Sequence, residues 1–177
     1  MNDKILVTYA TRYGSTKEVA ESIAATLREH GVAVDLQPMH EMLILEGYSA
    51  VVLGAPLYMG RWDKDADRFL SRHREALMRR PVAIFALGPV STDEAGWQSA
   101  HTMFDRAMAK YPWLTPIALE MFGGKYDPTK LRFPDNLIAK LPASPLHNAP
   151  ASDVRDWTAI QAWASNLVSM LRPVLST

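Results

Sequence analysis

The sequence predicts an α/β domain in which a five-stranded parallel sheet is covered by helices on both faces. Its 177 residues match the size of a single domain, so we expect residues 1–177 to fold as one unit. Short apolar runs alternate with segments of helical periodicity, as expected because parallel strands need crossover helices. A polar turn containing a glycine follows the first apolar run, where open α/β sheets bind their ligands.

The first strand and helix are the most clearly marked elements. Residues 5–9 form an apolar run rich in β-formers, typical of a buried strand. Apolar residues then recur at helical spacing over residues 19–27. Ser15 and Glu18 fit a capping box, which predicts that the helix begins at Ser15, and Gly31 suits its C-terminal cap.

The remaining elements continue the alternation. A turn at Ala55-Pro56 is expected to end the third strand, and Gly88-Pro89 the fourth. Apolar periodicity in the last helix assigns its inner face to Trp157, Ile160, Ala164, Leu167, Val168 and Leu171. The further strands are expected at residues 32–36, 50–54, 82–87 and 117–122, and the further helices at 65–77, 97–109 and 153–171.

Composition excludes several classes of function. Lys plus Arg equals Asp plus Glu at 19 each, which gives no global electrostatic reason to bind nucleic acid. The absence of cysteine excludes disulfides, thiolate catalysis and iron–sulfur clusters, and the five histidines are scattered without a metal-binding motif. Because no run approaches the roughly 18 apolar residues of a membrane span, we expect a cytoplasmic protein, with peripheral membrane contact left open.

The first strand-to-helix turn, residues 11–16, is the strongest candidate site. A helix N-terminus presents unpaired N–H groups, and the hydroxyls of Thr11, Ser15 and Thr16 surround it, which favours a phosphate. The alternative is that Ser15 only caps the helix and Thr11 only closes the turn. The G-x-G-x-x-G and G-x-x-x-x-G-K-[ST] patterns of dinucleotide and P-loop sites are absent.

Three segments carry a family resemblance. Residues 9–20 (YATRYGSTKEVA) resemble the FMN phosphate loop of flavodoxins, and residues 54–61 (GAPLYMGR) resemble the second FMN loop. Residues 122–127 (FGGKYD) and Asp156-Trp157 resemble the branch of menaquinone-dependent protoporphyrinogen dehydrogenases and their flavodoxin-domain relatives. Arg12 and Tyr13 depart from the family pattern, in which threonines are more common.

The resemblance implies the strand order 2-1-3-4-5 and FMN as the cofactor. Tyr58 and Trp62 are candidates to stack on the flavin ring, although Trp62 is equally explained as an anchor for the following helix. The implied cofactor-binding residues are Thr11, Arg12, Tyr13, Gly14, Ser15 and Thr16 at the phosphate, and Pro56, Leu57, Tyr58, Met59, Gly60, Trp62, Gly88, Pro89 and Val90 at the ring.

Residues 125–151 form an insert before the last helix. Five prolines exclude one long helix, and an amphipathic piece lies at residues 131–141. Its apolar residues are expected either to cover the flavin edge, bind an apolar substrate or touch a membrane, or only to cap the sheet.

Two functional classes follow from these features. The first is an FMN oxidoreductase that acts on an apolar small molecule or a quinone, as the resemblance to the protoporphyrinogen branch implies. The second is an electron-transfer module for a redox protein partner; the neutral charge and the apolar insert favour the first. The departures at Arg12 and Tyr13 leave a third class, a binding module that has lost FMN. No residue is singled out as catalytic.

Overall fold

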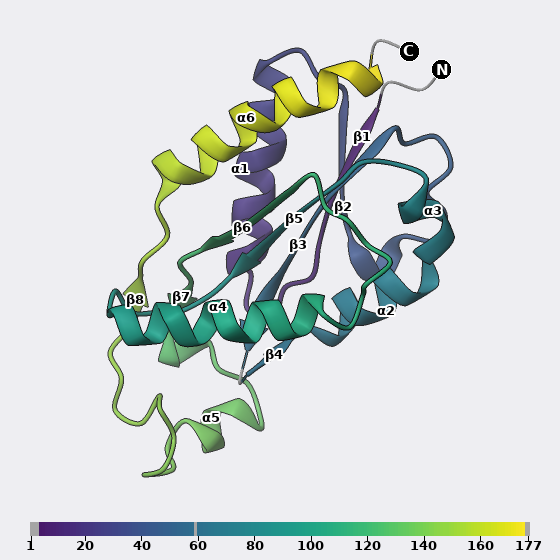
Figure 1. The fold of residues 1–177 in the computed structure, drawn as a ribbon. Helices are drawn as coiled ribbons and strands as arrows, with labels where there is room; N and C mark the ends of the chain where they lie inside the picture. Colours follow the sequence, from purple (N-terminus) through teal and green to yellow (C-terminus); the bar gives the residue numbers. More distant parts are fainter. Residues whose placement is uncertain (1–3, 59, 176–177) are drawn as a thin grey trace.

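The structure, a computed structural model, describes residues 4–58 and 60–175 (Figure 1). Its strands are β1 (Ile5–Tyr9), β2 (Val34–Pro38), β3 (Ala50–Tyr58), β4 (Arg61–Trp62), β5 (Val82–Leu87), β6 (Ala118–Phe122), β7 (Lys125–Tyr126) and β8 (Ser152–Asp153). Its helices are α1 (Ser15–Glu29), α2 (Lys64–Arg72), α3 (Arg74–Met78), α4 (Glu94–Met108), α5 (Asp135–Ile138) and α6 (Trp157–Leu175), with short 3-10 turns at Met39–Glu41 and Pro128–Lys130.

The main sheet confirms the predicted topology. Its parallel strands follow the order β2-β1-β3-β5-β6, and β4 pairs antiparallel with the end of β3. Because β5 and β6 are the expected fourth and fifth strands, this order is the predicted 2-1-3-4-5. Such an order reverses between β1 and β3, and open α/β sheets bind ligands outside the carboxyl ends of the strands at that point.

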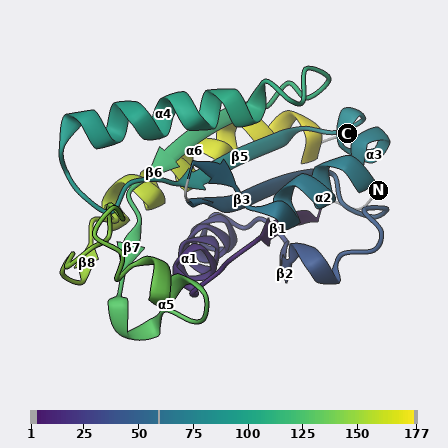
Figure 2. The same cartoon turned by 90° about the horizontal axis from the view of Figure 1, so that it is seen from below.

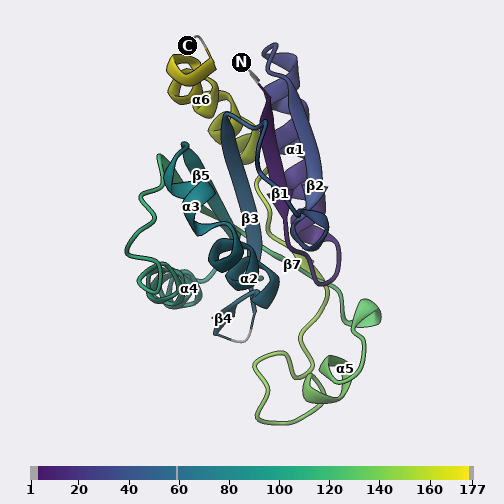
Figure 3. The same ribbon diagram turned by 90° about the vertical axis from the view of Figure 1, so that its right-hand side faces the viewer.

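Two cores cover the two faces of the sheet. Alternation along β1 sends Ile5 and Val7 to one face and Leu6 to the other. The first core packs against α1 and α6, and the second packs against α2 and α4. Figure 3 shows α1 on one side of the sheet and α2 and α4 on the other. The expected doubly wound layers are therefore present.

The third strand continues beyond its predicted end. The expected turn at Ala55-Pro56 is wrong, because Pro56 still pairs in register with Leu87 of β5. Leu57 and Tyr58 then pair with β4, which keeps the chain extended. Part of the segment predicted to be the second FMN loop, residues 54–61, therefore belongs to β3.

Three helices differ from the predicted ones. The helix predicted over residues 65–77 is divided at the buried His73 into α2 and α3. Helix α4 begins earlier than predicted, since the Asp93 carboxylate caps it by accepting from the Gly96 N–H at 2.7 Å. Helix α6 begins at Trp157 rather than at Asp153, because Asp153 pairs with Lys125 between β7 and β8. Trp157 is 38% exposed, so its predicted place on the inner face is wrong.

The predicted insert leaves the sheet at β7 and returns at β8. Figure 2 shows β7, β8 and α5 gathered at one end of the molecule, beside the start of α1. The amphipathic piece contributes only the short helix α5, whose Asp135 is buried. Among the described helices, none is both long and apolar enough to cross a bilayer.

Candidate functional site

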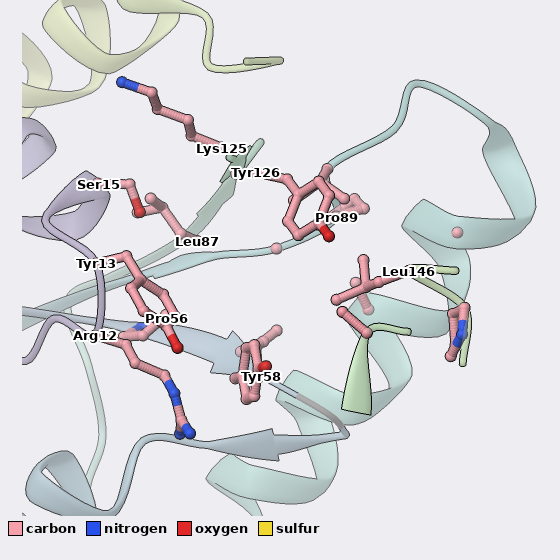
Figure 4. A pocket seen from close by; sticks show the side chains of 18 of the residues that line it. Arg12, Tyr13, Ser15, Pro56, Tyr58, Leu87, Pro89, Lys125, Tyr126 and Leu146 are labelled. Atoms are coloured by element: carbon pink, nitrogen blue, oxygen red, sulfur yellow. The ribbon is translucent and has the colours of Figure 1, made fainter. Parts of the chain in front are cut away.

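A cavity of about 620 Å³ opens at the carboxyl ends of β1, β3 and β5 (Figure 4). This volume lies within the range of roughly 300–1,000 Å³ typical of small-molecule sites. The first strand-to-helix turn and the loops after β3 and β5 form its walls, and α4 and the insert complete them. Residues from each part include Ser15, Tyr58, Pro89, Met103 and Ile138.

The structure brings most of the predicted cofactor residues together around this cavity. Those that line it are Arg12, Tyr13, Ser15, Pro56, Leu57, Tyr58, Gly60, Gly88, Pro89 and Val90. Thr11, Gly14, Thr16 and Trp62 are not among the lining residues, and Met59 lies outside the described residues.

Trp62 lies in the second core rather than at the cavity. Its side chain is only 3% exposed, and its indole N–H donates to the Ala55 carbonyl at 3.2 Å. Its ring also meets the Phe104 ring edge-on, with 5.9 Å between centroids. The Trp62 ring is therefore held among core side chains and has no surface on the cavity. The prediction of a stacking role for Trp62 is therefore corrected, and the anchoring role explains its position.

The phosphate turn is shaped by Thr11 and Gly14. The Gly14 N–H donates to Thr11 Oγ1 at 2.9 Å, and Gly14 has a φ of 92°, a left-handed conformation that favours glycine. Ser15 is the first residue of α1, and among the described residues no side chain caps the start of this helix. The predicted capping box is wrong, because Glu18 instead accepts from the Arg155 guanidinium at 2.6 Å. Gly31 with φ 81° follows α1 and confirms the predicted C-terminal glycine.

Thr16 is the main indication that this turn binds a ligand. Its side chain is fully buried in the first turn of α1, and its Oγ1 has no hydrogen-bond partner among the described residues. A buried hydroxyl without a partner costs about 1–3 kcal/mol. The first N–H groups of a helix also lack intrahelical partners and carry partial positive charge. This end of the cavity is therefore suited to an anion.

Arg12 and Tyr13 connect the phosphate turn to the insert. Arg12 donates to both carboxylate oxygens of Asp135, at 2.7 and 2.9 Å, and the Tyr13 hydroxyl donates to the same carboxylate. Asp135 is 3% exposed, and the Arg12 guanidinium lies 4.4 Å from the centre of the Tyr58 ring. The two departures from the family pattern therefore serve a specific contact with α5.

The same contacts set the protonation of the cluster. Burial alone would raise the pKa of Asp135, but the hydrogen bonds from Tyr13 and Arg12 outweigh it and hold that pKa below its ordinary value. Burial, followed by the charge of Asp135, raises the pKa of Tyr58 to about 12. At neutral pH Asp135 is therefore ionised and the Tyr58 phenol stays neutral.

Several lining residues were not predicted individually. The sequence singled out the insert as a whole but not its Lys125, Tyr126 or Leu146, which line the cavity. It also gave no signal for Met103 on α4, since apolar residues of an amphipathic helix normally face the core. Among the described residues, no group of three or more His, Asp or Glu side chains is placed to hold a metal.

Comparison with known proteins gives three kinds of similarity. The family model described as the flavodoxin domain matches residues 6–150. Protoporphyrinogen IX dehydrogenase [quinone] of Escherichia coli K12 is 31% identical over 90 residues, which are 50% of each chain. The matched stretch thus spans about half the length of this curated relative.

Solved structures show the same fold at low sequence identity. Oxidised flavodoxin 1 from Bacillus cereus has a TM-score of 0.58 at 17% identity, with 94% of this chain and 97% of that one covered. The rubredoxin oxygen:oxidoreductase of Desulfovibrio gigas has a TM-score of 0.59 at 13% identity, with 99% of this chain and 37% of that one covered.

The cavity fits FMN, the cofactor that these similarities indicate. Ser15 in the first turn of α1 lines the end that suits its phosphate, with the unpartnered Thr16 hydroxyl in the same turn, and Tyr58 and the loop after β5 line the part where a flat ring would fit. Gly88, which also lines the cavity, packs against the core on its other side, where a Cβ would lie 2.7 Å from the Met121 sulfur. The chain's own residues therefore match the two ends of this cofactor.

Thr16→Val tests the phosphate end. We expect FMN affinity to fall about tenfold, because the variant loses a hydroxyl that can donate to a charged oxygen. The melting temperature of the apoprotein should stay the same or rise, since the lost hydroxyl has no partner there. Fluorescence titration with FMN and thermal unfolding measure the two effects. A lower apoprotein melting temperature with unchanged FMN affinity would make Thr16 purely structural.

Proposed function

The chain belongs to the flavodoxin domain family, and we propose that it is an FMN-dependent dehydrogenase of a bulky apolar substrate. The proposed acceptor of the reducing equivalents is a quinone. Protoporphyrinogen or a compound of similar size and shape is the proposed substrate, because the dehydrogenase named above is 31% identical over half of this chain.

The observation that carries this proposal is that the insert forms part of the same cavity as the flavin loops. Leu131, Ile138 and Leu146 extend the apolar lining beyond the predicted flavin-binding residues. A cavity lined by such residues offers a surface to an apolar molecule beside the ring. In an electron carrier the flavin edge needs only contact with a partner protein, so an added apolar wall favours a small-molecule reaction.

FMN, when bound, supplies the hydride and single-electron chemistry. The protein's own residues hold and shield the reacting parts. The walls from α4 and the insert limit the access of water to the ring. The neutral Tyr58 offers an aromatic face, and the Arg12–Asp135 pair holds the insert against the phosphate turn. The insert is therefore already in position to form one wall of the site before the substrate binds.

The proposed quinone is a lipid-soluble acceptor, so the exposed apolar side chains of the insert are proposed to contact the membrane. Phe133, Leu137 and Leu141 are three exposed large apolar side chains of the insert. In this proposal the protein is cytoplasmic, and these side chains make peripheral contact with a membrane that holds the quinone. An electron-transfer role is the alternative, favoured by the full-length similarity to the flavodoxin of Bacillus cereus.

Ile138→Ser, compared with Leu137→Ser, tests the dehydrogenase proposal. Ile138 lines the cavity, whereas the neighbouring Leu137 is 52% exposed. With a water-soluble quinone we expect Ile138→Ser to lower kcat/KM for protoporphyrinogen roughly tenfold or more, because an apolar contact in a pocket is replaced by a polar group. Leu137→Ser should leave kcat/KM unchanged, and both variants should retain FMN.

The parent protein decides between the two functions. Quinone-dependent oxidation of protoporphyrinogen or a porphyrinogen analogue supports the dehydrogenase. A parent that is inactive with every quinone tested, yet exchanges electrons rapidly with a flavodoxin reductase, is an electron-transfer protein. Equal losses in the two insert variants would mean that the cavity wall does not contact substrate.

A further inference from the structure

Lys125 lies at the phosphate end of the cavity, on β7. Figure 4 shows its side chain and Ser15 at the same end, with Tyr58 and Leu146 further along. Lys125 and Ser15 both line the cavity, and the Lys125 Nζ is 4.0 Å from Glu18 in the first turn of α1. Its charge is therefore next to the helix end that suits a phosphate.

Two other cations near this end are already paired. Arg12 is bound by both oxygens of Asp135. Arg155, whose side chain is 2% exposed, donates to Asp153 and Glu18 at 2.6 Å and to the Ser15 carbonyl at 3.3 Å. Among the cations that line the cavity, Lys125 and the exposed Lys130 therefore remain without a short ion pair.

Lys125 differs from Arg12 and Arg155 because its ion pair is much longer, and it differs from Lys130 because it lies beside the first turn of α1. Glu18 lies 4.0 Å from Lys125 but only 2.6 Å from Arg155, so Glu18 keeps its stronger partner when the lysine moves. The Lys125 side chain is 30% exposed and can reorient. Lys17, at the same end of α1, is half-exposed, pairs with Glu21 at 3.8 Å and is not among the lining residues.

The backbone on either side of Lys125 is firmly placed. The Gly124 N–H donates to the Pro89 carbonyl at 2.7 Å, and its carbonyl accepts from the Val154 N–H at 3.1 Å. Lys125 itself pairs in register with Asp153 of β8. The Lys125 side chain thus extends from a fixed strand that is bonded to the loop after β5 and to the segment that precedes α6.

We propose that Lys125 binds the phosphate of FMN and supplies positive charge beside the first turn of α1. On binding, its ammonium group exchanges the long contact with Glu18 for a charge-assisted hydrogen bond to a phosphate oxygen. This makes Lys125 a determinant of selectivity for FMN over riboflavin, which has no phosphate. The proposal depends on FMN binding and not on the dehydrogenase activity, so either can fail alone.

Titration of the apoprotein with FMN and with riboflavin tests this role. Lys125→Gln should weaken FMN binding about tenfold, the lower part of the range for a hydrogen bond to a charged group, and leave riboflavin affinity unchanged. Lys17→Gln removes the same charge from the same helix end and should change neither affinity. Lys125→Arg should restore most of the FMN affinity, because it restores the positive charge.

Two further measurements make the result decisive. Salt should weaken FMN binding to the parent more than to Lys125→Gln, because screening acts on the charge that the variant lacks. The melting temperature of the apoprotein shows whether Lys125→Gln is folded. If the variant is unfolded, the salt dependence of FMN binding by the parent still tests the proposal. Equal loss of FMN and riboflavin affinity, no loss of either, or an equal effect of Lys17→Gln would overturn the assignment.

Discussion

Replacement of Gly123 by alanine is expected to lower the free energy of unfolding by about 3 kcal/mol, the upper end of the usual cost of overpacking. A Cβ at this position would lie 2.2 Å from the Val154 carbonyl oxygen and 2.9 Å from its Cγ2. The oxygen belongs to the backbone that follows β8, so a side-chain rotation cannot relieve the collision. The melting temperature should fall by roughly 6–12 °C for a chain of this size.

The site of the collision gives this variant a functional consequence. Gly123 directly follows β6 and lies two residues before Lys125, the first residue of β7, and β7 and β8 form the base from which the insert projects. Pushing Val154 away would separate these strands and displace Lys125 and Tyr126, which line the cavity. We therefore expect weaker FMN binding together with the lower stability.

A double variant identifies the atom responsible. Val154→Ala removes the Cγ2 contact but keeps the carbonyl oxygen, so Gly123→Ala/Val154→Ala should remain as unstable as the sum of its single changes predicts. Calorimetry on the four proteins of the cycle measures the coupling. Recovery of stability in the double variant would show that the valine side chain, rather than the backbone, occupies the space beside Gly123.

The predictability of the fold and of the site differs for a physical reason. Period-two and helical apolar patterns are local, and they predicted the strands and the helices that cover both faces of the sheet, whereas the family resemblance implied the strand order. The sequence also predicted a binding site at the turn of residues 11–16, and three residues of this turn line the cavity. The position of the turn depends only on the strand before it and the helix after it. Boundaries failed where a distant contact decides them, as where β8 delays the start of α6.

The same distinction explains the site residues. Trp62 has the chemistry of a stacking residue, but its partner Phe104 comes from α4, and sequence alone does not place that ring. Ser15 and Glu18 fit a local capping box, yet Arg155, 137 residues further on, takes the Glu18 carboxylate. From the sequence, Arg12 and Tyr13 were departures from the family's phosphate loop that left open a loss of FMN binding. In the structure both donate to the carboxylate of Asp135, a residue more than 120 positions away.

Asp135→Ala is expected to destabilise the protein by about 2 kcal/mol. Removing one partner of a buried ion pair costs roughly 3–5 kcal/mol, and we reduce this because the Arg12 side chain is 42% exposed and regains water. The Tyr13 hydroxyl loses its acceptor as well. Asp105→Ala, on the exposed face of α4, removes an acid of the same type and should change the melting temperature little.

The pH dependence of Asp135→Asn separates the charge of this carboxylate from its shape. Because hydrogen bonds from Tyr13 and Arg12 hold the pKa of Asp135 below its ordinary value in the folded protein, the ionised carboxylate stabilises the fold above the unfolded pKa of about 3.9. That contribution is lost as the pH falls through the lower, folded pKa.

The parent should therefore melt at a higher temperature than Asp135→Asn at pH 6, and the difference in melting temperature should narrow steadily below about pH 4, where the parent carboxyl also becomes neutral. Thermal unfolding between about pH 3 and pH 7 measures this difference. A constant difference across that range would mean that the asparagine disturbs packing around α5 and that the charge of Asp135 contributes nothing to holding the insert on the phosphate turn.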